Sequence, residues 1–347
     1  MPAARRPQVL TRSALRERVA LRPRIPLAHL PTPLDEALNL SRALGPRILI
    51  KRDDATGLAF GGNKTRQLEF LMADARAQGA DTIVACAATQ SNFCRQTTAA
   101  ARKLGMDVAL LLSRGVKGTT LQGNLLLDHL MGAAIEFVDF WSIDQFLEAM
   151  EAKAEALRRQ GKKPYVMDMW RQLTPIAAVA YVDCFLELAD QLDQRGIAAD
   201  YLYLSGANIT PAGLALAAKA TGSQIQVVGV TPMRWEEDRP TDIARIANAT
   251  AQLLGIDTRL TPQEIKNLEG YIGQGYGMVS EQGAEAIKLV ARTEGLFLDP
   301  VYSSKGMAGL IDQIRQGHIR PDQTVVFLHT GGTPALFAYH QELTAAE

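Results

Sequence analysis

The stretch 81-DTIVACAATQSNFCRQTTAAARKLGMDVALLLS-113 places two apolar runs on either side of a segment of helical composition. Residues 81–88 and 107–113 predict strands, and residues 92–104 predict the helix between them. Strands joined through a helix of this length lie parallel with a right-handed crossover. The stretch therefore predicts a β–α–β unit, and its nearly continuous apolar strands indicate that helices cover both faces of the sheet.

The same alternation extends in both directions along the chain. Further strands are predicted at RILIKRDD (47–54), AIEFVDF (134–140), PYVMDM (164–169), DYLYLSG (200–206), QIQVVGVTP (224–232), LFLDPVYS (296–303) and TVVFLHTGG (324–332). Further helices are predicted at 63–78, 121–132 and 142–160. The pattern predicts a doubly wound α/β protein with two mainly parallel sheets.

Composition excludes several classes of function. The 347 residues contain 37 Lys plus Arg and 37 Asp plus Glu, so no global charge favours nucleic acid or an anionic membrane. Apolar runs are of strand length, well short of the roughly 20 residues of a membrane span. Cys86, Cys94 and Cys184 form no CxxC motif and the five histidines are scattered, so we expect no metal site. Few cysteines suit a reduced cytoplasm.

The first 24 residues contain seven arginines and one acidic residue. This composition is compatible with a transit-like segment or with an N-terminal arm that is frayed or docked on the body. Because ALRERVAL (14–21) has no clean apolar face, we predict an arm.

Polar and glycine-rich segments follow several of the predicted strands. In open α/β sheets, ligands bind beyond the carboxyl ends of the strands, in the loops that lead into helices. The joints of this kind are GGNKTR (61–66), AATQSN (87–92), SGANITPAG (205–213), HTGGTPA (329–335) and DPVYSSKG (299–306).

Lys64 lies at the predicted start of a helix, where the helix dipole disfavours a cation. An amine that forms a Schiff base benefits from a lowered pKa. An exposed or anion-binding lysine fits the same pattern, so the joint alone leaves both interpretations open.

The other joints also have two interpretations. The segment 89–92 offers hydroxyls and amides to a ligand, yet Ser and Asn are preferred helix N-caps. The joint 205–213 forms either a phosphate cradle of backbone N–H groups or a tight crossover. Tyr302, and Tyr276 in the glycine-rich GQGYGMVS, either transfer protons or pack.

Taken together, these segments resemble a known family. IKRDD, TGLAFGGNKTRQLEFL, ATQSN, LDPVYSSKGMAGL and FLHTGGTPALFAY are similar to the D-cysteine desulfhydrase and 1-aminocyclopropane-1-carboxylate (ACC) deaminase family, with L-cysteate sulfo-lyases as relatives. These are fold type II, tryptophan-synthase-β-like enzymes that use pyridoxal 5′-phosphate (PLP). The resemblance runs from about Pro26 to Tyr339.

The resemblance implies two mainly parallel domains with the PLP site in the cleft between them. We accordingly predict an N-terminal arm at 1–24, a large PLP-binding domain at 25–66 plus 170–347, and a small α/β domain at 67–169. It further implies a homodimer with a small amino acid as substrate.

The resemblance also implies the roles of site residues. Lys64 would hold PLP as a Schiff base and move the substrate's Cα proton. The other cofactor contacts would be Asn92 at the 3′-oxygen, Ala207, Asn208, Ile209 and Thr210 at the 5′-phosphate, and Thr330 near the pyridine nitrogen. The catalytic residues besides Lys64 would be Ser91, which lies beside the substrate carboxylate or assists proton transfer, and Tyr276 and Tyr302, which face the substrate. The substrate contacts would be Ser91, Gln90, Trp170, Arg171 and Tyr302.

Three departures from the family pattern bear on the reaction. Ser303 stands where ACC deaminases have glutamate. A hydroxyl from Ser303 or Thr330 beside the pyridine nitrogen would leave the ring largely neutral. A neutral ring is a weaker electron sink, which suits β-elimination. Asn208, Ile209 and Pro211 alter the phosphate loop. Trp170 and Arg171 stand where relatives have a turn of small residues close to the substrate. Arg171 offers a partner for an anionic substrate group.

We therefore predict a PLP-dependent carbon–sulfur lyase or deaminase that performs α,β-elimination on a small β-substituted amino acid and releases a keto acid and ammonia. The alternatives are ACC deaminase or L-cysteate sulfo-lyase activity, a racemase or β-replacement enzyme, and an inactive PLP- or metabolite-binding homologue.

Overall fold

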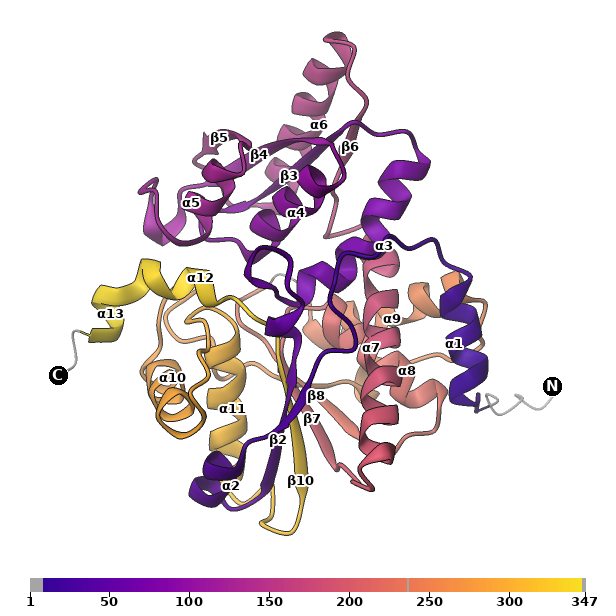
Figure 1. The fold of residues 1–347 in the computed structure, drawn as a ribbon, viewed down its shortest axis with the longest axis vertical. Coiled ribbons are helices and arrows are strands. Elements are labelled where there is room, and N and C mark those ends of the chain that lie inside the picture. The colour runs from indigo at the N-terminus through magenta and orange to yellow at the C-terminus, as the bar shows by residue number, and fades with distance from the viewer. Residues whose placement is uncertain (1–8, 236, 345–347) are drawn as a thin grey trace.

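A computed structural model describes residues 9–235 and 237–344, which form two sheets covered by helices and confirm the predicted α/β class (Figure 1). The strands are β1 (Leu34–Glu36), β2 (Arg47–Arg52), β3 (Thr82–Ala88), β4 (Asp107–Ser113), β5 (Ala134–Val138), β6 (Pro164–Val166), β7 (Tyr201–Ser205), β8 (Gln226–Val230), β9 (Lys266–Leu268) and β10 (Thr324–His329). The helices are α1 (Arg12–Ala20), α2 (Leu38–Leu44), α3 (Asn63–Ala77), α4 (Asn92–Lys103), α5 (Gly123–Leu130), α6 (Ile143–Arg159), α7 (Thr174–Gln194), α8 (Ile209–Ala220), α9 (Arg239–Leu254), α10 (Glu281–Glu294), α11 (Ser303–Arg315), α12 (Thr333–Leu336) and α13 (His340–Thr344).

The larger sheet has the strand order β1-β2-β10-β7-β8-β9, and the smaller sheet has the order β5-β4-β3-β6. Neighbouring strands are parallel except β1, which pairs antiparallel with β2. All strands of the smaller sheet come from the predicted small domain, and it lies above the larger sheet in Figure 1. The domain boundaries themselves stay a prediction.

Side chains on β10 show why its sequence is continuously apolar. Val326 and Leu328 pack into the core cluster that contains α3, α7 and α8, whereas Val325 and Phe327 pack into the cluster that contains α10 and α11. Successive side chains of a strand point to opposite faces. Helices therefore bury both faces of the larger sheet.

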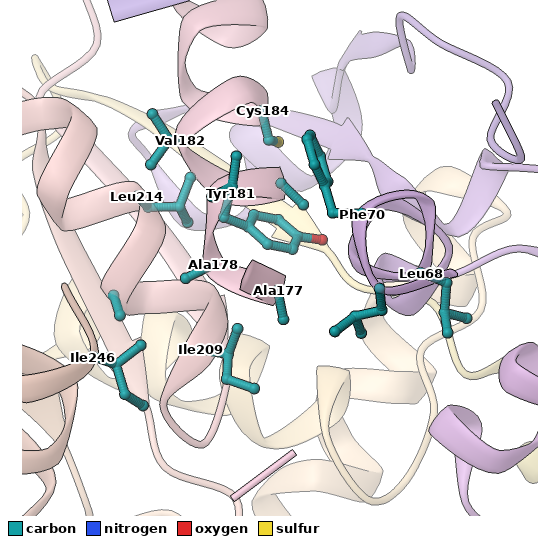
Figure 2. Close-up of a cluster of buried hydrophobic side chains, with 14 of the residues drawn as sticks. Leu68, Phe70, Ala177, Ala178, Tyr181, Val182, Cys184, Ile209, Leu214 and Ile246 are labelled. Atoms are coloured by element: carbon teal, nitrogen blue, oxygen red, sulfur yellow. The ribbon is translucent and has the colours of Figure 1, made fainter. Parts of the chain in front are cut away.

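Helix α7 packs closely against α8 and α3. A Cβ on Gly213 of α8 would lie 2.3 Å from the carbonyl oxygen of Ala178, so this contact needs a residue without a side chain. In Figure 2 the ring of Tyr181 points from α7 toward α3, beside Leu68 and Phe70. This packing fixes the helix that begins at the GGNKTR joint.

A buried charge network ties α3 to β2 and α7. The Arg66 guanidinium donates to Asp53 at 2.9 Å and to Glu187 at 2.8 Å, and Lys51 pairs with the same glutamate. The Tyr181 hydroxyl donates to Asp53 at 2.8 Å. Burial alone would raise the pKa of Glu187, but the hydrogen bonds and charges of Arg66 and Lys51 lower it to about 2.

The prediction of a strand at residues 296–303 is wrong, because this segment is irregular until α11 begins at Ser303. The Asp299 carboxylate accepts the backbone N–H groups of Val301, Tyr302 and Ser303 at 2.7–3.0 Å, which curls the chain into a turn. Leu298 is nevertheless buried, so its apolar character reflects packing rather than sheet pairing.

Other strand predictions differ in extent. Strand β6 ends at Val166, earlier than predicted, because the Asp168 carboxylate accepts the backbone N–H groups of Trp170 and Arg171 at 3.0 and 2.9 Å. The three-residue strands β1 and β9 were not predicted.

The described part of the N-terminal arm docks on α7, whereas residues 1–8 lie outside the described residues. Leu15 and Val19, one helical turn apart on α1, are buried against the body and form an apolar face that the sequence alone did not reveal. Arg12 and Arg16 both pair with Asp190 of α7. The three cysteines are free and buried. Within residues 9–235 and 237–344, no helix has the length and apolar character needed to cross a membrane.

Candidate active site

A cavity of about 780 Å³ lies at the carboxyl ends of strands from both sheets. Its wall includes residues that end or directly follow β3, β7 and β10. The cavity brings together the predicted site residues Lys64, Ser91, Asn92, Trp170, Arg171, Ala207, Asn208, Ile209, Thr210, Tyr276, Tyr302 and Thr330. Joints that are far apart in sequence therefore form one site, as strand topology predicts.

Gln90 is the predicted site residue that does not line the cavity. Its side-chain amide donates to the carbonyl oxygen of Gln122 at 3.0 Å, and its side-chain oxygen accepts the backbone N–H of Asn124 at 2.9 Å. Both ends of this side chain are used to hold the segment before α5. The predicted substrate contact of Gln90 is not supported by this geometry.

Lys64 is the second residue of α3, and the joint that carries it touches the HTGG joint. The backbone N–H of Asn63 donates to the carbonyl oxygen of Thr330 at 2.9 Å. A Cβ on Gly331 would lie 2.6 Å from the Cα of Gly62. The glycines of both joints thus permit an approach of two backbones that brings Lys64 and Thr330 to the same cavity.

The Lys64 amine faces the cavity without a partner. In the part of the chain that the structure describes, no hydrogen bond or ion pair engages it. Burial in the protein lowers the pKa of this amine to about 8. A large fraction is therefore neutral near pH 8, the form that attacks a carbonyl carbon or accepts a proton.

The joint 205–210 presents unpaired donors at the N-terminus of α8. No acceptor among the described residues pairs with the backbone N–H groups of Ala207, Asn208 or Thr210. The Asn208 side-chain oxygen accepts the N–H of Ile209 at 2.8 Å, and its amide donates to Asp242 at 2.9 Å. Free N–H groups at a helix N-terminus form an anion-binding site.

Ser91 and Asn92 begin α4 at the cavity wall. The Ser91 hydroxyl accepts the N–H of Cys94 at 3.1 Å, so it is the N-cap that the sequence allowed, and it also lines the cavity. The Asn92 side-chain oxygen accepts a hydrogen bond from Asn124 at 2.8 Å, which orients the amide. Capping and ligand contact are compatible in this geometry.

The two predicted tyrosines form a hydrogen-bonded pair. The hydroxyls of Tyr276 and Tyr302 lie 2.6 Å apart, and their rings meet edge to face. Burial raises the pKa of Tyr276 to about 12 and that of Tyr302 further. Both phenols therefore keep their protons near neutral pH and present a donor to the cavity.

Trp170 and Arg171 lie in the turn that Asp168 caps, at the outer part of the cavity. The Trp170 ring stacks on Phe146 at 5.8 Å between centroids, and the Arg171 guanidinium forms an exposed ion pair with Asp144. This pairing neutralises the cation that the sequence offered to an anionic substrate group.

Ser303 does not reach the cavity, in contrast to Thr330. Its hydroxyl donates to the Asp299 carboxylate at 2.7 Å and also accepts the backbone N–H of Asp299, and the side chain is fully buried. Of the two hydroxyls considered for the ring nitrogen, Thr330 is therefore the one that the cavity presents.

Several wall residues were missed by sequence reasoning, namely Trp141, Phe146, Ser205, Met233, Arg234, Trp235, Asp242 and Arg245. Those at 141–146 follow β5, and those at 233–245 follow β8, so the rule that ligands lie beyond strand ends was the available signal. Without glycines or a recognisable motif, these loops resembled ordinary connections.

A buried amine without a partner, an anion cradle at a helix N-terminus and a paired-tyrosine wall define a site of the kind that PLP-dependent enzymes use. A model of the family described as "Pyridoxal-phosphate dependent enzyme" matches residues 25–331. The chain belongs to this family, and its cofactor is PLP.

Curated relatives of the chain are named D-cysteine desulfhydrase. That of Serratia proteamaculans is 41% identical over 95% of this chain and 99% of the relative, and that of Klebsiella pneumoniae is 39% identical over 92% and 97%. A solved structure titled as an ACC deaminase homologue has a TM-score of 0.86 and 34% identity, covering 96% of this chain and 98% of that chain. The similarity confirms the family that the motifs indicated.

The residues present fit PLP. The free Lys64 amine would be the group that holds the cofactor through its aldehyde, and the unpaired N–H groups of Ala207, Asn208 and Thr210 suit its phosphate. Asn92 and Thr330 line the same cavity and would provide polar contacts for the ring. The departures at Asn208 and Ile209 leave the cradle open, because the Asn208 side chain is directed to Asp242 and to its own helix.

We expect cofactor-free protein to capture PLP at a rate that rises with pH up to about 8 and then levels off. The neutral amine is the reactive form, and burial lowers the pKa of Lys64 to about 8. Stopped-flow absorbance of PLP binding between pH 6 and 10 measures this profile. A rate that keeps rising toward the roughly 10.4 of an exposed lysine would contradict the buried amine.

Proposed function

We propose that the protein is a lyase of the D-cysteine desulfhydrase type, which eliminates the β-substituent of a small amino acid and releases a keto acid and ammonia. The observation that carries the proposal is the Lys64 amine, unpartnered and with a lowered pKa, in one cavity with the protonated Tyr276–Tyr302 pair. The names and coverage of the curated relatives support it.

Lys64 and the tyrosine pair carry out different proton transfers in the proposed reaction. PLP, when bound, supplies the sink for the electron pair left at Cα. The neutral Lys64 amine accepts the Cα proton of the substrate, because its lowered pKa matches a general base working near neutrality. The Tyr276 and Tyr302 hydroxyls hold their protons; one donates to the other, and the remaining O–H of the pair donates a hydrogen bond to the departing group as it gains negative charge.

The remaining predicted residues position substrate and cofactor. Ser91 and its neighbouring backbone at the start of α4 suit the substrate carboxylate, since a helix N-terminus attracts anions. Thr330 would contact the ring nitrogen through a hydroxyl, which leaves the nitrogen largely unprotonated. That arrangement favours departure of a β-leaving group over opening of a cyclopropane ring.

The test is a panel of D- and L-amino acids with β-leaving groups, together with ACC, assayed for keto acid and ammonia. We expect turnover of D-cysteine and β-chloro-D-alanine and no turnover of ACC. Racemisation or β-replacement would instead appear as enantiomer exchange, or as a new thioether when a thiol is added. Absence of turnover of any amino acid by PLP-loaded protein would favour the binding-protein alternative.

Two further expectations accompany this proposal. A homodimer and a cytoplasmic location stay predictions from the sequence. Sedimentation of the PLP-loaded protein measures the first, and fractionation of cells measures the second.

A further inference from the structure

Four aromatic side chains form a continuous surface on one side of the cavity, which we call the aromatic wall. Its members are Trp141, Phe146, Trp170 and Tyr276. Trp141 stacks on Tyr276 with ring centroids 5.2 Å apart and contacts Phe146 edge to face at 5.6 Å. Phe146 lies nearly parallel to Trp170, with 8° between the ring planes.

The wall is held in place by the local structure around it. Trp141 follows β5, Phe146 is buried on α6, and Trp170 is set by the backbone N–H groups that Asp168 accepts. Tyr276 lies in the segment between β9 and α10 and is the last ring of the series. Because each ring is supported by the next, the wall is an ordered apolar surface rather than a set of mobile side chains.

The wall leaves apolar surface open to the cavity. Trp141 is 46% exposed, and Trp170 and Tyr276 are partly exposed, while all three line the cavity. Exposed aromatic surface in a concave site is stabilised when an apolar group covers it. The volume of about 780 Å³ is in the range that holds larger ligands together with their polar anchors.

The cation next to Trp170 in sequence, Arg171, already has an anionic partner. The Arg171 guanidinium is exposed and already paired with Asp144, so it is not a buried cation held ready for a sulfonate or carboxylate on the substrate. Tyr276 has a pKa raised by burial, and its neutral hydroxyl shares a hydrogen bond with that of Tyr302. An uncharged, apolar substituent needs no such cation.

We propose that the enzyme, given the elimination reaction proposed above, acts on cysteine thioethers whose sulfur carries an aryl or bulky alkyl group. This group packs against the aromatic wall while the amino acid portion lies by Lys64. The Cα–H proton passes to Lys64, the Cβ–S bond breaks, and the sulfur leaves with the electron pair and takes up a proton as a thiol. Water then converts the three-carbon fragment to pyruvate and ammonium, so one thioether and one water yield one thiol, pyruvate and ammonium without any oxidant.

The experiment compares S-phenyl-D-cysteine with D-cysteine on the PLP-loaded wild type and on Trp170→Ala and Trp141→Ala. We expect the wild type to release pyruvate from both substrates. In each variant the ratio of kcat/KM for S-phenyl-D-cysteine to that for D-cysteine should fall at least about tenfold, the scale of a lost apolar contact in a substrate pocket. Taking the ratio within each protein cancels the intrinsic reactivity of the two leaving groups.

Inhibition provides a readout that needs no elimination. D-Homophenylalanine, which has a methylene in place of sulfur, should inhibit D-cysteine turnover at least about tenfold more tightly than D-alanine. Trp170→Ala should remove that preference. Phe337→Ala, which changes an exposed aromatic outside the cavity, should keep both the kcat/KM ratio and the inhibition preference of the wild type.

The outcomes separate this inference from the proposed function. Turnover of D-cysteine without turnover of S-phenyl-D-cysteine, or a ratio unchanged in Trp170→Ala and Trp141→Ala, would overturn the inference and leave the elimination reaction in place. Failure of the PLP-loaded protein to release pyruvate from either substrate would overturn both.

Discussion

Replacing Lys64 with alanine is expected to lower amino-acid turnover by about 10³-fold or more, the range that a positioned proton-transfer group contributes. The amine is the one predicted catalytic base in the cavity, and burial keeps its pKa at about 8, where it accepts a proton near neutral pH. The variant should also lose the visible absorbance band of bound PLP that borohydride abolishes. Full turnover by Lys64→Ala would refute the proposed mechanism.

Lys305 provides a matched control for this experiment. It is also buried, and burial lowers its pKa to about 8, but its amine donates to the carbonyl oxygens of Pro232 and Gly275 at 3.1 and 3.0 Å. Lys305→Met should therefore keep the band that borohydride abolishes. Peptide mapping of borohydride-treated wild type should find the reduced cofactor on Lys64 and unmodified Lys305.

Replacing Arg66 with methionine should lower the free energy of unfolding by about 3–5 kcal/mol, the cost of removing one partner from a buried ion pair. Asp53 is fully buried and would keep only hydroxyl donors from Thr32 and Tyr181. Glu187 would lose the partner that lowers its pKa most strongly. Denaturant unfolding followed by circular dichroism measures the change.

Arg158 on α6 offers the comparison, because its ion pairs with Glu151 and Glu155 are exposed to solvent. Arg158→Met should leave the unfolding midpoint unchanged, as is usual for surface pairs. If Arg66→Met proved as stable as Arg158→Met, the network would be dispensable for holding α3.

The sequence predicted the strand–helix joints well, because local signals coincide there. Continuous apolar runs mark β3 and β4, Ser91 caps α4, and glycines precede α3, so the predicted bounds lie within about two residues of the observed ones. Segments 296–303 and 164–169 were misjudged in type or length, because Asp299 and Asp168 bind backbone N–H groups that a strand would have used. An apolar run does not reveal such side-chain competition.

The site was predictable to the extent that strand topology places residues together. Lys64, Asn92, Asn208 and Thr330 follow different strands and still meet in one cavity. The structural role of Gln90 could not be predicted, because its hydrogen-bond partners lie more than 30 residues away in sequence. Two members of the aromatic wall, Trp141 and Phe146, were equally hidden, because the position of Trp141 depends on how α6 and the 271–279 loop pack around it.

The bond between Ser303 and Asp299 constrains how this chain could be converted to ACC deaminase chemistry. A glutamate at position 303 would place a longer, charged side chain in a fully buried space beside the Asp299 carboxylate, and it would remove the hydroxyl that bonds both to that carboxylate and to the Asp299 backbone N–H. It would also break the turn that places Tyr302, since the same aspartate holds three backbone N–H groups. The single substitution Ser303→Glu would therefore test the packing around the Asp299 turn before it tests the reaction.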